Sequence, residues 1–363
     1  MSKKKQKKQG SGLLGRILRR FFLTLFTIVI LLVVGLSLVM NLVFNGPSPA
    51  ARDVLTMSLL EPSATKWIPG LFMDEEIVES IRNAGKDNEI QEEQNLDDIV
   101  IMDASTMAAS DEWAAYPDGI RIESYSGKTF NAHIMLIQDP SRVYLGLSSY
   151  DGFSTSKPGK RLNVAIEDEG ASAAVNAGAF NDDGTANATV GSIPAGLTIH
   201  NGQVVSNQYR DLVPEKGFCG FNTDNKLVVA ETMTAEQAME QNIRDGCEFG
   251  PVLIVNGVPN QAVYSGNSGY NPRTVVGQRA DGVVIFVCAD GRQAGSLGAT
   301  YKDMIDILIS YGAVNACNMD GGSSSIMLYR NYQTGQVEMV NSYSVLQSEP
   351  RRMPNFWMVK PLQ

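Results

Sequence analysis

Histidine is nearly absent from this 363-residue chain, which contains only His133 and His200. The sequence has no Gly-x-Ser-x-Gly elbow, no Walker loop, no glycine fingerprint for a dinucleotide, and no Cys-x-x-Cys or Cys/His spacing of a zinc site. With two histidines and no motif around either, a Ser-His-Asp triad is not expected. We predict no cofactor and no metal ligands, and leave open only a divalent cation bound by carboxylates.

Cysteine is also infrequent, with four residues at Cys219, Cys247, Cys288 and Cys317. Cys288 and Cys317 each lie inside an apolar run, where a cysteine usually serves as a small buried hydrophobic residue. Disulfides would be permitted outside the cell. Because a sequence does not fix connectivity, free and paired states both stay open.

Basic residues are scarce outside the N-terminus. The first 20 residues hold eight lysines and arginines and no acid, which leaves 22 basic and 39 acidic residues in the remainder, a net charge of about −17. A surface that acidic lacks the basic footprint of nucleic-acid binding, so no nucleic-acid partner is expected. The eight basic residues are Lys3, Lys4, Lys5, Lys7, Lys8, Arg16, Arg19 and Arg20.

A long uncharged run extends from Phe21 to Phe44 and contains no proline. It exceeds the roughly 20 apolar residues that span a bilayer core, and it is longer than the apolar region of a signal peptide, about 7–15 residues. We predict a retained transmembrane helix; a cleaved signal peptide is the alternative, because residues 47–51 offer a cleavage site. The preceding basic cluster orients the N-terminus to the cytoplasm. The expected protein is thus single-pass in the cell membrane, with its C-terminal domain extracellular.

Four regions follow from this pattern: a basic cytoplasmic tail (1–20), a transmembrane helix (21–44), a stalk and linker (45–115) and one large domain (116–363). Short helices are expected at 53–60 and 74–81, and the acidic stretch 85–98 is typical of a solvated linker. In the domain, Asn201-Gly202 between two apolar stretches predicts a β-hairpin.

A strand–helix–strand unit predicts the fold class. Residues 282–288 form an apolar run typical of a buried strand, 300–311 have a helical pattern, and 313–319 form a second apolar run. Thr300 with Asp303 approximates a capping box, and Gly312 suits the helix end. A crossover of this length joins parallel strands. We therefore predict an α+β domain, a mixed β-sheet with packed helices and at least one parallel βαβ unit, preceded by a single transmembrane helix.

Two Asp-Gly loops follow these strands directly: Asp290-Gly291-Arg292, and Asp320 with the glycine- and serine-rich stretch behind it. The carboxyl ends of parallel strands are where ligands bind in α/β sheets, so we expect the two aspartates to be neighbours. Two carboxylates at one edge suit glycoside hydrolysis or a hard metal ion. The backbone N–H groups of residues 321–323 could bind an anionic oxygen. A simple turn is the alternative interpretation of each Asp-Gly pair.

Two further segments supply candidate ligand groups. In Asn271-Pro272-Arg273-Thr274 the proline restrains the backbone before an arginine whose planar fork suits phosphate or carboxylate. The alternative is an arginine paired with a structural acid. Asn176 ends an apolar strand in the stretch 176–180, which places its amide at a strand-to-loop edge.

Over roughly residues 120–362 the chain resembles the phosphodiester glycosidase family. The resemblance rests on the combination and order of five segments: 176–180, 194–197, 271–274, 290–292 and 320–324. Bacterial members are often labelled exopolysaccharide-biosynthesis proteins. The resemblance implies hydrolysis of a sugar-1-phosphodiester on the C–O side, in cell-envelope or exopolysaccharide material. For this reaction we predict Asp290 and Asp320 as the catalytic residues. The predicted substrate-binding set is Asn176, Gly178, Asn271, Arg273, Thr274, Arg292, Gly321, Gly322, Ser323 and Ser324.

Two other functions stay open from the residues. One is a non-catalytic envelope module that binds an anionic glycopolymer through the same arginines and loop amides. The other is a metal-dependent phosphodiesterase that cleaves P–O instead of C–O. In each case the expected partners are a carbohydrate phosphodiester and the membrane.

Overall fold

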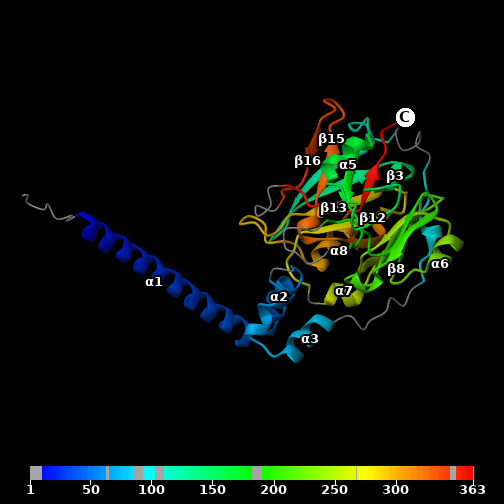
Figure 1. Cartoon of the computed structure of the whole chain (residues 1–363). Coiled ribbons are helices and arrows are strands. Elements are labelled where there is room, and N and C mark those ends of the chain that lie inside the picture. Colours follow the sequence, from blue (N-terminus) through cyan, green and yellow to red (C-terminus); the bar gives the residue numbers. More distant parts are fainter. Residues whose placement is uncertain are drawn as a thin grey trace, which may run out of the picture.

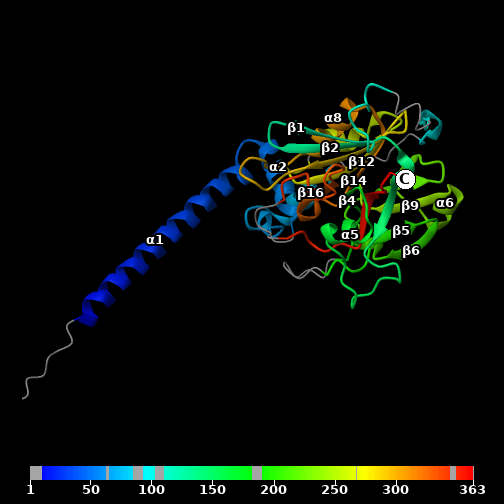
Figure 2. The same cartoon turned by 90° about the horizontal axis from the view of Figure 1, so that it is seen from above.

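The computed structural model describes residues 10–62, 65–84, 93–102, 110–181, 190–266, 268–343 and 349–362. The molecule consists of a long N-terminal helix that projects from a compact body of sheets and short helices (Figures 1 and 2). Two small helices lie where the long helix meets the body.

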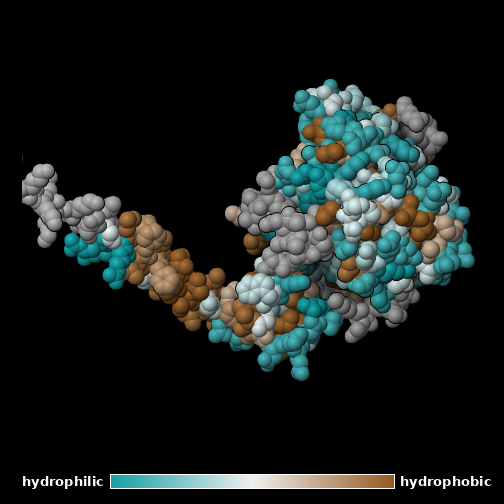
Figure 3. Space-filling view, in the orientation of Figure 1, coloured by the Kyte–Doolittle hydropathy of each residue, from teal (hydrophilic) through white to brown (hydrophobic). Residues whose placement is uncertain are grey.

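The projecting helix α1 spans Gly10–Asn45, and most of its apolar side chains from Ile17 to Leu42 lie on the molecular surface (Figure 3). It contains no internal proline and ends just before Pro47, which is consistent with the helix-breaking effect of that residue. Within it, Gly15–Asn45 is the one helix of the described residues that is long and apolar enough to cross a membrane. The predicted span at 21–44 falls inside it.

The segment after α1 folds back on the base of that helix. Helix α2 (Pro49–Leu60) begins at Ser48, whose side chain accepts a hydrogen bond from the Ala51 amide, and helix α3 is Glu75–Asn83. Phe44 of α1 stacks on Phe72, with ring centroids 5.3 Å apart, inside a small apolar cluster.

Helix α2 also lies on the body. The Tyr270 amide donates to the Ser58 hydroxyl at 2.9 Å. The chain approaches so closely there that a Cβ on Gly269 would lie 2.3 Å from the Ser58 nitrogen. The region predicted as a stalk therefore packs, through α2, directly against the domain.

A seven-stranded sheet, in the order β1-β2-β13-β12-β14-β10-β11, forms the centre of the body. Strands β13 (Val284–Ala289) and β14 (Ala313–Met319) are joined by α8 (Tyr301–Ser310) and run in the same direction, as predicted. They are not adjacent, because β12 (Arg273–Arg279) lies between them and pairs antiparallel with both. The other strands of this sheet are β1 (Ile120–Ser126), β2 (Asn131–Ile137), β10 (Val252–Val255) and β11 (Val258–Pro259).

Two five-stranded sheets complete the body, with the orders β16-β15-β4-β17-β3 and β6-β5-β9-β7-β8. The first contains β3 (Val143–Leu147), β4 (Ala173–Asn176), β15 (Met327–Arg330), β16 (Val337–Met339) and β17 (Asn355–Val359). The second contains β5 (Gly196–His200), β6 (Gln203–Gln208), β7 (Phe218–Asn222), β8 (Leu227–Ala230) and β9 (Ile243–Glu248). The short helices are α5 (Leu162–Asp168), α6 (Ala235–Glu240) and α7 (Gln261–Ser265). The predicted hairpin at Asn201-Gly202 joins β5 to β6.

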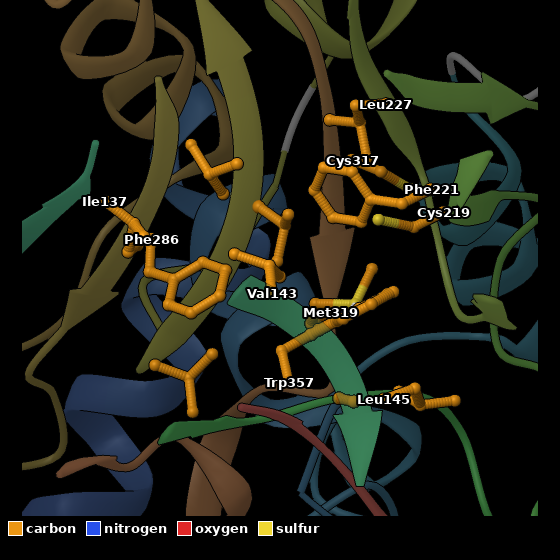
Figure 4. Close-up of a cluster of buried hydrophobic side chains, with 14 of the residues drawn as sticks. Ile137, Val143, Leu145, Cys219, Phe221, Leu227, Phe286, Cys317, Met319 and Trp357 are labelled. Carbon is orange, nitrogen blue, oxygen red and sulfur yellow. The ribbon is translucent and has the colours of Figure 1, made fainter. Parts of the chain in front are cut away.

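Side chains from all three sheets form the main core (Figure 4). Trp357 packs edge-on against Phe221 at a centroid distance of 5.5 Å. Helix α8 covers the other face of the seven-stranded sheet through residues such as Met304 and Leu308. The four cysteines are buried free thiols, and burial raises the pKa of each, so they serve as the small buried residues expected of Cys288 and Cys317.

Candidate active site

Three predicted loops meet at one edge of the seven-stranded sheet. Strands β13 and β14 end at this edge because they run in the same direction, and β12 begins there because it runs the opposite way. The Asp290, Asp320 and Asn271 segments therefore come together although they are far apart in the sequence. The Gly322 amide donates to the Pro272 carbonyl at 2.8 Å, which joins two of the three loops.

Glycines in these loops allow the Asn271-Pro272 backbone to be enclosed from three directions. A Cβ on Gly291 would lie 2.6 Å from the Pro272 nitrogen, and one on Gly321 would lie 2.9 Å from the Pro272 oxygen. Gly298 has a φ of +130° and would place a Cβ 2.4 Å from the Asn271 nitrogen. The close approach of backbone to backbone thus explains these glycines without any ligand.

Asn176 joins β4 to the same edge. Its amide nitrogen donates to the Asp320 carbonyl at 2.6 Å, and its amide oxygen accepts from the Thr274 hydroxyl at 2.7 Å and from the Ile326 amide at 3.2 Å. Asn176 and Thr274 are both fully buried. The structure therefore gives these two predicted binding residues a positioning role, holding the Asp320 loop against β4 and β12.

Gly178 has a comparable position. Its amide donates to the Asn355 side chain at 2.9 Å, and a Cβ there would come within 2.9 Å of the Cys247 Cβ. Packing against β9 and β17 accounts for this glycine.

Arg273 lies behind the edge and is only 2% exposed. Its guanidinium donates to Glu61 and to the Gly269 carbonyl, both at 3.0 Å, and stacks over the Tyr301 ring at 3.8 Å from the centroid. Burial lowers the pKa of Arg273, but Glu61, Tyr301 and Glu215 together outweigh this effect, so the pKa lies above its ordinary value. The arginine paired with an acid, left open by the sequence, is the arrangement that the structure contains.

Asp290 is 4% exposed and holds two neighbouring loops. Its carboxylate accepts from the Ser342 amide at 2.9 Å and lies 3.7 Å from the His133 ring, while its carbonyl accepts from the Ser296 hydroxyl at 2.8 Å. Asp290 and Asp320 follow strands that end at the same edge, as predicted, but these strands are not adjacent, because β12 lies between them.

Asp320 and residues 321–323 are partly exposed, and Arg292 lies over this loop. Gly322 has a φ of +61° and begins the 3-10 turn Gly322–Ser324; a Cβ on it would lie 2.9 Å from an Arg292 Nη. Burial lowers the pKa of Arg292, against the raising effect of the Glu61 and Asp320 carboxylates.

Arg292 is held from the other side by Asn271, whose side-chain oxygen accepts from an Arg292 Nη at 3.1 Å. The backbone of Arg292 has a φ of 57°, a conformation that non-glycine residues rarely adopt and that is often found at functional sites. Both predicted residues thus contribute to the partly exposed part of the edge.

Arg351 is a member of this site that the sequence did not reveal. Its Nη1 donates to the Ser323 and Ser324 hydroxyls at 3.3 and 3.4 Å, and its guanidinium lies 4.7 Å from the centroid of the Phe180 ring. The Tyr343 hydroxyl donates to the Ser323 carbonyl at 2.7 Å and accepts from the Arg351 amide. Only the fold brings this arginine to a loop that lies almost 30 residues earlier.

The partly exposed edge therefore combines the Asp320 carboxylate with two guanidiniums, those of Arg292 and Arg351. Two neighbouring guanidinium groups favour the binding of an oxyanion such as a phosphate. Among the described residues, no group of three or more His, Cys, Asp or Glu side chains could hold a metal ion. The arrangement can bind an anion beside a carboxylate that acts on a neighbouring atom.

A family model of phosphodiester glycosidases matches residues 169–360, just over half of the chain. The chain belongs to this family. The matched region contains every site residue from Asn176 to Arg351, whereas Glu61 and His133 lie outside it. The α+β fold is that of the family.

This member of the phosphodiester glycosidase family is similar to the SPbeta prophage-derived uncharacterized protein YomE of Bacillus subtilis (strain 168). The two are 31% identical over 140 residues, which cover 34% of this chain. The chain spans only 22% of that relative's length.

Among solved structures, the chain resembles the zebrafish N-acetylglucosamine-1-phosphodiester alpha-N-acetylglucosaminidase catalytic domain, auto-inhibited by its pro-peptide. The identity is 18%, the TM-score 0.51, and the coverage 66% of this chain and 82% of that one. A putative exported protein of Burkholderia pseudomallei K96243 aligns with 15% identity and a TM-score of 0.47, covering 71% of this chain and 89% of that one.

Proposed function

We propose that this protein is a hydrolase that cleaves the bond between a sugar's anomeric carbon and a phosphodiester oxygen. Family membership supports action on phosphodiester-linked sugars. The observation that carries the proposal is the location of Asp320 in a partly exposed loop contacted by Arg292 and Arg351. The solved zebrafish relative is named for N-acetylglucosamine-1-phosphodiester, which makes that sugar the first substrate to test.

In the proposed reaction the C1–O bond breaks, the phosphate leaves as a monoester, and water supplies the new oxygen on C1. The departing phosphate is a good leaving group, so its charge needs stabilising more than it needs a proton. Arg292 and Arg351 supply that stabilisation as preorganised donors. Asp320 activates the water or stabilises the positive charge that develops on the sugar.

The buried members of the predicted set act indirectly in this proposal. Asn176 and Thr274 hold the Asp320 loop, and Asn271 orients Arg292. Asp290 fixes the neighbouring loop through Ser342. Arg273 stabilises the base of the edge through Glu61 and Tyr301.

The test is hydrolysis of a nitrophenyl phosphodiester of N-acetylglucosamine-1-phosphate by the full chain in oxygen-18 water, with and without a chelator. Free sugar that carries the label is expected, because C–O cleavage places the water oxygen on C1. Arg351→Gln should lower kcat/KM on this substrate by about 10²–10³-fold, the scale of one lost oxyanion donor. An uncharged aryl glycoside of the same sugar should be affected much less.

Each of the other outcomes identifies a rival. Label in the phosphate, with loss of activity on chelation, would instead indicate a metal-dependent phosphodiesterase. Binding of the substrate with no turnover would indicate a non-catalytic glycopolymer-binding module of the envelope.

We also propose that α1 anchors the protein in the cell membrane, with the N-terminus in the cytoplasm and the domain outside, acting on cell-envelope or exopolysaccharide material. The support is the long apolar helix preceded by a basic cluster. External protease added to intact cells should digest the domain and leave an N-terminal reporter intact. Digestion of the domain only in inside-out vesicles would reverse the orientation, and a soluble domain that begins near residue 50 would indicate a cleaved signal peptide.

A further inference from the structure

A polar pocket of about 460 Å³ lies away from the candidate active site. Strand β17 connects the two places. Asn355, at its start, accepts from the Gly178 amide beside the active-site edge, and Lys360, just after its end, lines the pocket. Five strand residues at about 3.3 Å each separate them by roughly 16 Å. The pocket therefore lies at the opposite end of the β3-β17-β4 sheet.

A histidine–aspartate pair forms part of the pocket lining. The His200 Nδ1 lies 2.8 Å from the Leu145 carbonyl and 3.3 Å from the Asp245 carboxylate, so this nitrogen carries the proton. The Asp245 carboxylate is itself fixed by the Arg244 guanidinium at 2.6 Å and by the Asn201 amide. With Nδ1 held in this way, Nε2 is the ring nitrogen directed at a ligand. Hydrogen bonding to Asp245 raises the pKa of His200.

Aromatic side chains form another part of the lining. Tyr150 is 50% exposed, and its ring lies 5.3 Å from the His200 ring, tilted by 56°. Tyr144 is partly buried beside it, and the Lys360 ammonium lies 5.5 Å from the Tyr144 centroid. The exposed Tyr150 side chain offers a ligand both an apolar ring face and a polar hydroxyl group.

The charges around the pocket balance. Arg244 and Lys360 are cationic, and Asp245 and Glu169 are anionic, with all four in the lining. A site for a phosphate or a carboxylate would show an excess of positive charge, and a site for a cation would show the reverse. Balanced charge, hydrogen-bond donors and acceptors together, and an exposed aromatic face match a sugar ring, whose hydroxyls both donate and accept and whose C–H face is apolar. The volume lies in the range of small-ligand sites.

We infer that this pocket is an accessory binding site for an uncharged pyranose unit of a glycan, separate from the site of hydrolysis. Tyr150 packs on the face of the sugar, and His200, Asp245 and Glu169 hydrogen-bond its hydroxyls. The inference is independent of whether the other site cleaves a phosphodiester.

The test is calorimetric titration of the full chain, in a detergent without sugar groups, with cellotriose, maltotriose and tri-N-acetylchitotriose, and with trigalacturonate as an anionic comparison. We expect at least one neutral trisaccharide to bind. Tyr150→Ala should weaken its binding by about fivefold, which corresponds to the roughly 1 kcal/mol that ring packing contributes. Tyr150→Phe should retain most of the affinity. Tyr332→Ala is the matched control, because Tyr332 is an exposed tyrosine, 56% accessible, that does not line the pocket.

Tyr150→Ala should leave hydrolysis of the small nitrophenyl substrate unchanged, and Asp320→Asn should leave trisaccharide binding unchanged. No binding of any neutral trisaccharide would overturn the inference. Binding that Asp320→Asn removes and Tyr150→Ala preserves would also overturn it, because the sugar would then occupy the other site. Preference for trigalacturonate would show an anion site instead.

Discussion

Replacement of Asp320 by asparagine should lower kcat/KM for the sugar phosphodiester by about 10²–10⁴-fold, the usual contribution of a carboxylate that transfers a proton or stabilises charge. The melting temperature should change little, because the side chain is partly exposed and the loop is held by backbone groups instead. The Asp320 amide donates to Ala177 at 3.0 Å, and its carbonyl accepts from Asn176. Asparagine leaves both contacts intact.

The variant Asp290→Asn is the comparison that distinguishes the roles of the aspartates in the two Asp-Gly loops. Asp290 is buried and accepts from the Ser342 amide, so asparagine should lower the melting temperature, and activity should fall only through displacement of the loop. These expectations are tested on both variants by kcat and oxygen-18 labelling for activity and by circular dichroism for the melting temperature. If Asp290→Asn kept its stability and lost turnover while Asp320→Asn stayed active, the assignment of the two carboxylates would be reversed.

Replacement of Arg273 by leucine should reduce the free energy of unfolding by about 3–5 kcal/mol, the cost of breaking a buried ion pair by removing one partner. For a domain of this size that corresponds to a fall of roughly 6–20 °C in melting temperature. The loss arises because Glu61, the Gly269 carbonyl and the Ala299 carbonyl all lose their donor. Denaturant unfolding followed by tryptophan fluorescence measures it.

The matched control is Lys302→Met, which breaks the exposed ion pair with Asp306 on α8. Such surface pairs contribute at most about 1 kcal/mol, so its effect should be small. A double-mutant cycle with Glu61→Gln gives the coupling across the Arg273 pair. Unchanged stability in Arg273→Leu, with selective loss of phosphodiester hydrolysis, would instead make Arg273 a phosphate ligand.

Local features of the fold were predictable because the responsible interactions lie within a few residues. The Asn201-Gly202 pair adopts positive φ at both positions, as a tight hairpin requires. Thr300 and Asp303 exchange the two hydrogen bonds of a capping box at the start of α8. The apolar run at 21–44 is helical throughout.

Features that depend on strand order were not predictable from the same patterns. An apolar strand–helix–strand pattern indicates two strands in one direction, but it does not say whether another strand lies between them. Here β12 fills that position because its own apolar residues, such as Val275 and Val276, are buried on both faces of the sheet. The two aspartates consequently share an edge but do not follow adjacent strands.

The sequence predicted where the candidate site lies, but it did not predict the role of each residue in it. The motifs identified the loops that meet, but exposure decides which side chains reach a ligand, and exposure depends on what packs behind each loop. Glu61, from a segment predicted to stand apart from the domain, pairs with Arg273. Arg351 has no local motif and reaches Ser323 only through the path of the C-terminal strand.

The three glycines that enclose Asn271-Pro272 determine where this domain tolerates sequence change. Gly291, Gly298 and Gly321 leave no room for even a methyl group without moving the backbone, so a library that randomised the Asp-Gly loops as a whole would consist mostly of misfolded variants. Diversity intended to alter substrate preference belongs at Phe180, whose ring lies 4.7 Å from the Arg351 guanidinium, and not at Tyr343, whose hydroxyl holds the Ser323 carbonyl of the loop. In this domain, the most recognisable sequence motifs are the positions least suited to engineering.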